Sequence, residues 1–345
     1  MRILVTGHDG YIGAVLVPLL LSAGHQVTGL DSFLFRGCDF GPEPLPVDVV
    51  ELDIRDVERQ HLAGIDAVIH LAALSNDPLC EINPQSTWQI NYEATIRLAE
   101  IARAVGVERF IQASTCSLYG ASGGELLDET APIAPVTAYG KAKAQVEVDL
   151  ALMATDTFSP VCLRNGTAYG RSPRLRTDLV VNNLLGYAHT TGEIQVKSDG
   201  TQWRPMIHVE DIARAFLVSL EVPREAVHNQ MLNVGSTCEN FRVSELAGII
   251  QRVVPGSRTT IGTGLGPDQR TYRVNCDRIS REPIGFEPQW TIEAGVKDLH
   301  EAFMTYGFTA EDFASSRYFR LRTIVDLMEN GFLDENLRRT VLTTN

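Results

Sequence analysis

An apolar, β-forming run at residues 2–6 leads through the loop TGHDGYIG at 6–13 into an apolar helix that is predicted from Tyr11 to Ala23 and ended by Gly24. This succession constrains the fold more than any other feature, because a strand that turns tightly into a helix is the opening unit of parallel α/β sheets. Further short apolar runs predict more strands. They lie at 26–30, 47–52, 67–70 and 109–113.

A long helical stretch is predicted between two of these strands, from Pro84 to Val105. Its apolar residues recur at helical spacing, as Ile90, Ala94, Leu98, Ile101 and Val105. Continuous apolar strands that alternate with helices indicate a parallel sheet covered on both faces. The predicted fold class is therefore α/β, a Rossmann-type doubly wound parallel sheet.

The chain is long for one compact core, and its 345 residues predict a large domain with a smaller one. After Leu163 the pattern loosens into the Gly-, Arg- and Pro-rich loop LRNGTAYGRSPRLRTD. Later segments then predict helices at 179–191 and 208–221 and a strand at 230–234. We expect a main domain at 1–165, a smaller lobe at 166–305 with segments that return to the sheet, and a helical extension at 306–345.

Charge and cysteine content exclude several classes of protein. The net charge of −13 argues against a nucleic-acid partner, since phosphate backbones are bound by clustered Lys and Arg. No apolar stretch approaches the ~20 residues that span a bilayer, and Met1 runs directly into the first strand. Six cysteines lack metal-like pairing, which predicts reduced thiols, no metal site and a cytoplasmic protein without a membrane partner.

Tyr139 and Lys143 stand four residues apart in YGKAK, so on a helix they project from one face. A free tyrosine has a pKa of about 10, and a nearby cation favours the phenolate. The phenolate can take the proton of a hydroxyl while the adjacent C–H leaves as hydride. Thr115, upstream in STCSLYG, can hold that hydroxyl by a hydrogen bond.

The glycines of the first loop, Gly7, Gly10 and Gly13, suit a backbone that closes on a pyrophosphate at a helix N-terminus. An ordinary strand–turn–helix junction is the alternative. The next strand ends in Asp31, where a carboxylate can accept hydrogen bonds from adenosine ribose hydroxyls. This favours NAD over NADP, although Arg36 would soften the preference if it turned inward.

Several motifs occur together and in one order. They are TGHDGYIG, LDSF, LDIRD, HLAA, Asn91, STCSLYG, YGKAK, LRNGTAYG and DGTQWRPMIHVEDIA. In this order the chain resembles the extended short-chain dehydrogenase/reductases, specifically the nucleotide-sugar epimerase/dehydratase branch. The resemblance runs from Met1 to about residue 305, and beyond it the sequence matches no motif of that family.

The resemblance implies an NAD site. Asp53 and Ile54 would grip the adenine, the small residues of HLAA would let the backbone pass the cofactor, and Asn91 would organise the site near Lys143. His70 is expected to be structural. The implied cofactor-binding set is Gly7, Gly10, Tyr11, Ile12, Gly13, Asp31, Asp53, Ile54, Leu71, Ala72, Ala73, Asn91, Tyr139 and Lys143.

The resemblance also implies a nucleoside-diphosphate sugar as substrate, bound in the smaller lobe. Arg204 and Arg270 match diphosphate-binding arginines, and a planar guanidinium pairs well with phosphate oxygens. Asn183 matches an asparagine that contacts the nucleotide. Thr167 stands where many relatives have asparagine, so its contact with substrate is an open expectation.

The candidate catalytic residues are Thr115, Tyr139, Lys143, Cys116 and Ser117. In 4,6-dehydratases of this family, Asp and Glu occupy the two positions after the catalytic Ser/Thr, where this chain has Cys116 and Ser117. A serine cannot replace a carboxylate as base without an activating partner. Cys116 is either an acid or base with a lowered pKa, or a packing cysteine.

These observations predict an NAD-dependent nucleotide-sugar epimerase that acts at C4 through a transient 4-keto intermediate, with Tyr139 as acid and base. The alternatives are a 4-keto-sugar reductase or dehydrogenase, a 4,6-dehydratase, and a dinucleotide-sensing binding protein without catalysis. A homodimer is expected. For residues 306–345, a lid, a dimer contact and a capping helix remain open.

Overall fold

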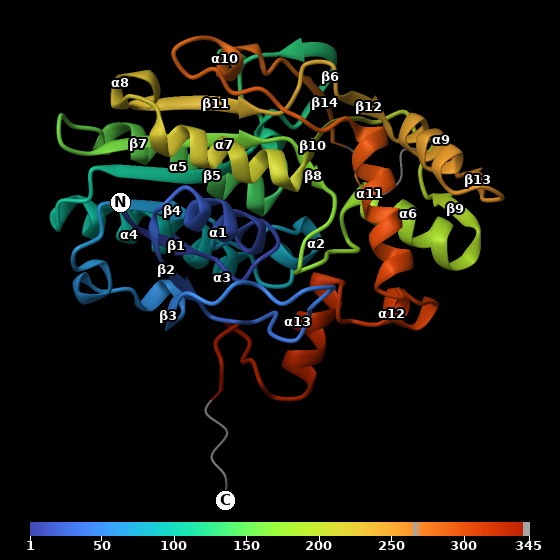
Figure 1. Ribbon diagram of the computed structural model, residues 1–345, viewed down its shortest axis with the longest axis horizontal. Helices are drawn as coiled ribbons and strands as arrows, with labels where there is room; N and C mark the ends of the chain where they lie inside the picture. The colour runs from blue at the N-terminus through green and yellow to red at the C-terminus, as the bar shows by residue number, and fades with distance from the viewer. Residues whose placement is uncertain (265–267, 269, 341–345) are drawn as a thin grey trace, which may run out of the picture.

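A seven-stranded parallel sheet forms the centre of the computed structural model, which describes residues 1–264, 268 and 270–340 (Figure 1). The strands run in the order β3, β2, β1, β4, β5, β7, β11, and every neighbouring pair is parallel. Their bounds are β1 Arg2–Thr6, β2 Gln26–Asp31, β3 Asp48–Glu51, β4 Ala67–His70, β5 Arg109–Thr115, β7 Ser159–Asn165 and β11 Gln230–Val234. The order turns back between β1 and β4, which opens a crevice at the carboxyl ends of the strands. The predicted α/β doubly wound fold is confirmed.

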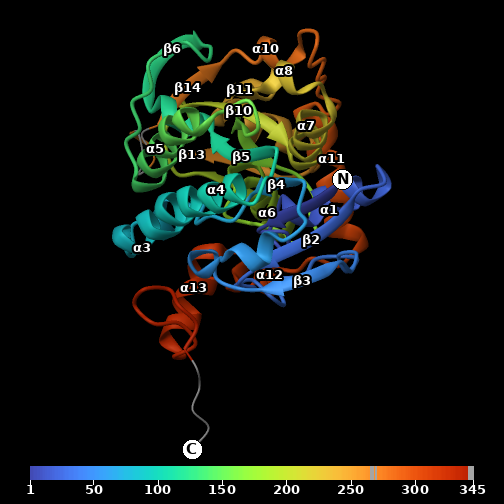
Figure 2. The ribbon, with the colours of Figure 1, turned by 90° about the vertical axis from the view of Figure 1, so that its left-hand side faces the viewer.

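Helices cover both faces of this sheet (Figure 2). Successive residues of β1 point to opposite faces: Ile3 and Val5 pack beneath α1 and α7, whereas Leu4 packs beneath α4 and α5. Both faces are therefore apolar, which explains the continuous apolar strands in the sequence. The helices are α1 Gly13–Ser22 and α7 Val209–Glu221 on one face, and α3 Pro84–Trp88, α4 Ala94–Ala104 and α5 Ala138–Met153 on the other.

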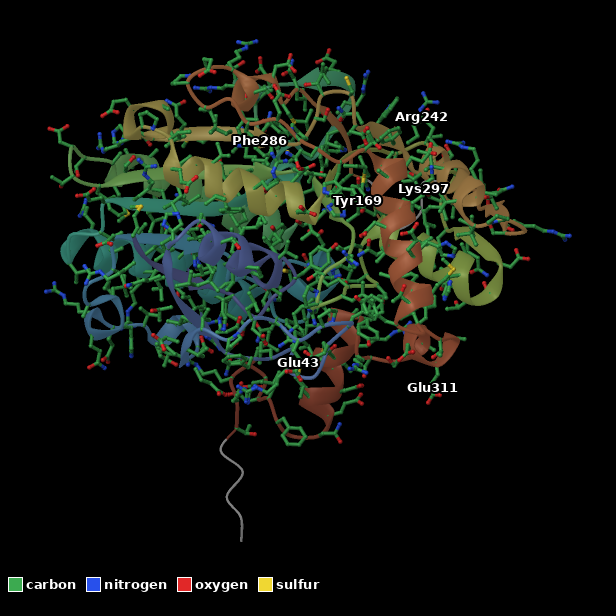
Figure 3. All side chains as sticks on the ribbon, in the orientation of Figure 1. Glu43, Tyr169, Arg242, Phe286, Lys297 and Glu311 are labelled. Carbon is green, nitrogen blue, oxygen red and sulfur yellow. The ribbon has the colours of Figure 1, made fainter. Side chains whose placement is uncertain are left out.

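A second core lies beyond the carboxyl ends of the strands, at the right of Figure 1, where α6, α9 and α11 pack together. Gly295 of α11 permits a close approach, since a Cβ there would lie 2.6 Å from the Tyr169 ring. In Figure 3, Tyr169 lies between α11 and the central sheet, and Lys297 lies on the opposite side of α11. The elements of this region are β6 Ala121–Leu127, β8 Thr167–Tyr169, α6 Val180–Thr191, β9 Glu193–Val196, β10 Trp203–His208, α8 Arg224–Val227, β12 Asn240–Arg242, α9 Val243–Val253, β13 Arg258–Ile261, β14 Thr271–Val274, α10 Asp277–Ser280 and α11 Ile292–Thr305.

The C-terminal segment crosses back to the first half of the chain. It contains α12 (Ala310–Ala314) and then α13 (Arg320–Glu329). Helix α13 contacts α2 (Asp77–Cys80), which belongs to the first half of the chain. Ile324, Leu333 and Leu337 are buried in the same core as Leu4 and Leu98. Both views place α13 at the β3 side of the molecule (Figures 1 and 2). Residues 341–345 of the predicted extension lie outside the described residues.

Two predicted helices differ in detail from those observed. The first begins at Gly13 rather than Tyr11, because residues 10–12 form a turn in which the Gly10 amide donates to the Gly7 carbonyl. The stretch 84–105 is interrupted by a π-helical turn at Gln89–Glu93 between α3 and α4. Within the part of the chain that the structure describes, no helix combines the length and apolarity needed to cross a membrane.

Candidate active site

A cavity of about 830 Å³ follows the carboxyl ends of the parallel strands and extends to β10 and β14. Most of the residues that the sequence singled out lie on its wall. They are Gly7, Gly10, Tyr11, Ile12, Gly13, Asp31, Asp53, Ile54, Leu71, Ala72, Ala73, Thr115, Ser117, Tyr139, Lys143, Thr167, Asn183, Arg204 and Arg270. Cys116 and Asn91 are not on the wall, and both are buried behind it.

The glycine loop has no room for side chains where it borders the cavity. Gly7 has a φ of +71°, and a Cβ on it would lie 2.7 Å from the Ala72 amide nitrogen. A Cβ on Gly13 would lie 2.4 Å from the Gly7 carbonyl oxygen. The loop backbone and the N-terminus of α1 therefore face the cavity directly, as binding of a phosphate group by main-chain amides requires.

Asp31 closes β2 beside this loop. Its carboxylate accepts hydrogen bonds from the Phe33 amide at 2.8 Å and the Asp9 amide at 3.1 Å. Burial raises the pKa of Asp31 above its usual range, and these hydrogen bonds oppose that effect. Arg36 does not turn toward Asp31: its guanidinium donates to Glu51 at 2.8 Å and lies over the Phe33 ring.

The residues Thr115, Tyr139 and Lys143 meet where β5 ends and α5 begins. The Tyr139 phenol is hydrogen-bonded to Thr115. Lys143 Nζ lies 6.0 Å from the centroid of the Tyr139 ring and donates to the Ala113 carbonyl at 2.8 Å. Burial lowers the pKa of Lys143 to about 8. The structure thus places a phenol, a hydroxyl and an amine together on the cavity wall.

The phenol itself differs from the sequence-based expectation. Burial raises the pKa of Tyr139, and the negative charge of Asp77 acts in the same direction. The hydrogen bond with Thr115 and the positive charge of Arg176 lower this pKa by less. The expected depression by Lys143 is therefore outweighed, because Tyr139 lies among apolar groups and near a carboxylate that the local motif did not reveal.

Asn91 and His70 support the wall from behind. The Asn91 side chain accepts from the Leu74 amide and donates to the Leu74 carbonyl, both at 2.8 Å. His70 is held between Thr6 and Thr95, at 2.6 and 2.9 Å, and burial lowers its pKa to about 3. His70 is thus structural, as expected, and Asn91 fixes the segment after β4 rather than facing the cavity.

A catalytic role for Cys116 is not supported. Its side chain is 1% exposed, its thiol donates to the Arg164 carbonyl at 3.0 Å, and burial raises its pKa well above the usual value. The thiol therefore packs away from the cavity as a neutral group. Ser117 does reach the cavity, where its hydroxyl accepts a hydrogen bond from Thr115 at 3.0 Å.

Arg204 and Arg270 lie together but are already paired with carboxylates. Both contact Asp268, at 2.8 and 2.7 Å, and Arg270 also contacts Asp77 at 2.6 Å. Asn183 donates to the Thr177 carbonyl at 2.8 Å. Of the segment GPDQRTYRV around Arg270, residues 266, 267 and 269 lie outside the described residues.

Sequence reasoning missed several polar residues of the wall. Arg176 and Asp178 form a buried pair at 2.6 Å, and the Asn76 amide donates to Asp178 at the same distance. The alternation in RLRTD was a signal for this pair, because two arginines and an aspartate in a loop next to a core need partners. Arg320 of α13 also lines the cavity, and no sequence motif predicted this position.

Comparison with known proteins identifies the class. The model of the NAD dependent epimerase/dehydratase family matches residues 3–235. The chain is 31% identical over 312 residues to UDP-glucose 4-epimerase of Corynebacterium glutamicum, covering 84% of this chain and 92% of that protein. It is 32% identical over 270 residues to UDP-glucose 4-epimerase of Homo sapiens, covering 68% and 77%. The protein belongs to the NAD dependent epimerase/dehydratase family, and its cofactor is NAD.

Solved structures agree with this assignment. UDP-glucose 4-epimerase of Thermotoga maritima with UDP-glucose superposes with a TM-score of 0.79 at 26% identity, over 88% of this chain and 99% of that one. MoeE5 in complex with UDP-glucuronic acid and NAD gives a TM-score of 0.76 at 27% identity, with the same coverage. The class defined by fold and site is thus an NAD-dependent epimerase or dehydratase.

Proposed function

We propose that this protein is a nucleotide-sugar epimerase that inverts C4 through a transient 4-keto sugar. The observation that carries the proposal is that Thr115, Tyr139 and Lys143 lie together on the wall of the cavity that the glycine loop also borders. Cys116 and Ser117 follow Thr115 directly after β5. Those two positions hold no carboxylate, so they supply no base for removing a proton from C5.

In this proposal Thr115 orients the C4 hydroxyl and Tyr139 takes its proton. Lys143, held by the Ala113 carbonyl, brings positive charge to the phenolate. When bound, NAD would accept the C4 hydride and later return it. The keto sugar must turn over between these two events, so that Tyr139 gives the proton back to the opposite epimer. The cavity of about 830 Å³ extends from the glycine loop to Arg204 and Arg270, so one space would hold both the cofactor and the sugar nucleotide.

The residues present fit NAD. The loop at Gly7, Gly10 and Gly13 leaves its backbone free for the diphosphate, and Asp31 is placed for the adenosine ribose. Arg36 is engaged by Glu51, so no described cation near Asp31 offsets its repulsion of a 2′-phosphate. NAD should accordingly bind better than NADP.

A nucleoside-diphosphate sugar would lie toward β10 and β14. We assign its diphosphate to Arg204 and Arg270, which would exchange the Asp268 carboxylate for phosphate oxygens. Asn183 and Thr167 lie on the same wall and are assigned to the nucleotide and the sugar. The identity of base and sugar is left to the assay.

Two measurements test the reaction class. In the first, the purified protein is denatured and the NAD that it releases is measured. In the second, the protein is incubated with UDP-glucose or UDP-galactose in deuterated water and the product is analysed. An epimerase retains NAD and gives a product without deuterium at C4 or C5. Turnover that consumes added NADH would instead show a 4-keto-sugar reductase, and NAD binding without turnover of any nucleotide sugar would show a sensor.

A 4,6-dehydratase is kept as the second candidate by one observation. Asp77 lines the cavity close enough to raise the pKa of Tyr139, and its buried Oδ1 atom has no hydrogen-bond partner among the residues that the structure describes. A carboxylate at this position could serve as the base that Cys116 and Ser117 do not provide. Deuterium at C5, or a 6-deoxy-4-keto product, would favour this reaction over epimerisation.

We also propose a homodimer that packs through α4 and α5. These helices lie side by side, and α5 presents Leu152 and Val148, which are 80% and 51% exposed. Large exposed apolar side chains on one face are typical of protein interfaces. Light scattering should give about twice the mass of one chain, and Leu152→Glu should shift the protein toward monomers.

A further inference from the structure

The C-terminal segment, residues 319–340, forms part of the cavity wall. Phe319, Arg320 and Leu321 from the start of α13, and Leu337 beyond its end, face the same space as the glycine loop. These residues belong to a stretch that matched no motif of the family. Their role must therefore be read from their contacts.

Arg320 is the charged residue of this wall segment. Its side chain is 4% exposed and its guanidinium lies 3.9 Å from the centroid of the Phe35 ring. Nη2 donates weakly to the Arg174 carbonyl at 3.5 Å, and the Cys38 thiol is a further polar neighbour. Nη1 has no hydrogen-bond partner among the described residues. A buried cation with an unpaired donor is costly, so an anionic ligand beside it would be stabilising.

The nearby carboxylates are already bound to other arginines. Asp178 is held by Arg176 at 2.6 Å, and Asp9 is held by Arg174 at 2.5 Å. Asp178 attracts Arg320 over a longer distance, but its oxygens are occupied. The described carboxylates nearest Arg320 are therefore already paired with other arginines, which leaves Nη1 of Arg320 without a partner among the described residues.

The position of Arg320 points to the cofactor rather than the sugar nucleotide. Phe35 follows Asp31, and Leu321 packs in the same cluster as Leu34 and Phe35. Arg204 belongs to β10 and Arg270 immediately precedes β14, and both strands lie far from α13 in both ribbon views (Figures 1 and 2). We propose that Arg320 binds the diphosphate of NAD, and that the segment 319–340 covers the adenosine end of the cavity.

Contacts at the other end of the segment support such a cover. Arg55 donates to the carbonyls of Asn336 and Leu337, at 2.8 and 3.3 Å, while it also pairs with Asp53. Arg338 pairs with Asp56 at 2.5 Å and lies 3.8 Å from Asp53. The strand-end residues that would surround an adenine are thus tied directly to the C-terminal segment. This inference rests on NAD binding and not on the sugar reaction.

The test compares Arg320→Gln with the parent protein by calorimetry, after bound NAD has been removed. The probes are ADP-ribose, which contains the diphosphate, adenosine, which lacks it, and UDP, which reports the substrate end. Loss of a charge-assisted contact should weaken ADP-ribose binding about 10- to 100-fold. Adenosine and UDP should bind as to the parent, within about twofold. The NAD released per purified chain should also fall.

Arg322→Gln is the matched control, because Arg322 lies on the same helix but is exposed and donates to the Ala314 carbonyl. It should bind all three probes normally. Arg320→Met, which keeps the apolar stem and removes only the charged group, repeats the test if the glutamine variant does not fold. Unchanged ADP-ribose binding in a folded variant overturns the proposal. A loss confined to UDP overturns it as well and assigns Arg320 to the substrate end.

Discussion

At the scale of single residues, the proton transfer depends on one phenol. Tyr139→Phe removes the acid and base and the hydrogen bond to Thr115, but it leaves the cavity shape almost unchanged. We expect activity to fall by at least about 100-fold, the usual contribution of general acid–base catalysis, while NAD stays bound. Epimerase rates and the NAD content of the same sample check both halves of this prediction. Near-normal turnover would remove Tyr139 from the mechanism.

Asp77 gives a pH prediction of definite sign. Its negative charge disfavours the Tyr139 phenolate and so raises the pKa of that phenol. Activity that needs the phenolate increases with pH up to this pKa. Asp77→Asn lowers the pKa, so the acidic limb of the kcat–pH profile should move to lower pH.

Arg270→Gln is the control for the Asp77 variant. It breaks the same ion pair, 2.6 Å long, but keeps the carboxylate charge near Tyr139. Its acidic limb should therefore not move to lower pH. If Asp77→Asn shifts the limb upward or not at all, the carboxylate does not act on Tyr139 in the working enzyme.

The residues that the sequence revealed are those whose roles depend on close spacing along the chain. Three glycines in one loop, and Tyr139 four residues before Lys143, form their sites within single turns. The pKa of Tyr139 was mispredicted because the YGKAK motif shows neither the burial of the phenol nor the approach of Asp77 from α2. Cys116 was a candidate because it follows Thr115, but at the end of a strand successive side chains point to opposite sides, and its thiol faces Arg164.

At the scale of elements, α5 is joined to the sheet by a buried ion pair. Glu147 contacts Arg164 of β7 at 2.6 Å and accepts from Ser114 of β5 at 2.5 Å. Glu147→Gln leaves a buried guanidinium without its counter-charge, which should cost about 3–5 kcal/mol of unfolding free energy. Urea unfolding measures this loss.

Lys141→Gln is a suitable comparison for Glu147→Gln, because Lys141 lies on the same helix and is exposed. Its effect should stay within about 0.5 kcal/mol. An equal loss in the two variants would mean that the helix, rather than the buried pair, responds to the substitutions.

Helices and strands could be predicted where a local sequence pattern determines their bounds. Arg2–Thr6, Ala67–His70 and Gln230–Val234 were predicted at the bounds observed, since apolar runs between turn residues define short strands. The π-helical turn at Gln89–Glu93 was not predicted. It lies in a stretch whose apolar residues keep helical spacing, so periodicity alone predicts an unbroken helix.

At the scale of the whole molecule, cofactor binding should be visible as stability. A ligand that binds only the native state adds about 2.7 kcal/mol when present at 100 times its Kd. We therefore expect NAD to raise the Tm by several degrees, and NADP at equal concentration to raise it less. Thermal unfolding of the parent and of Asp31→Ala checks this prediction. Removing the carboxylate should reduce the difference between the Tm increase caused by NAD and that caused by NADP. Equal shifts in the parent would contradict the assignment of Asp31.

The proposed cover of the adenosine end by residues 319–340 has a consequence for cofactor exchange. These residues come after every other described residue of the cavity wall along the chain, so this part of the wall is synthesised last. If NAD lies beneath the cover as proposed, it can leave only when residues 319–340 move away from the wall. An epimerase that restores its own cofactor in each cycle would not need that movement during turnover.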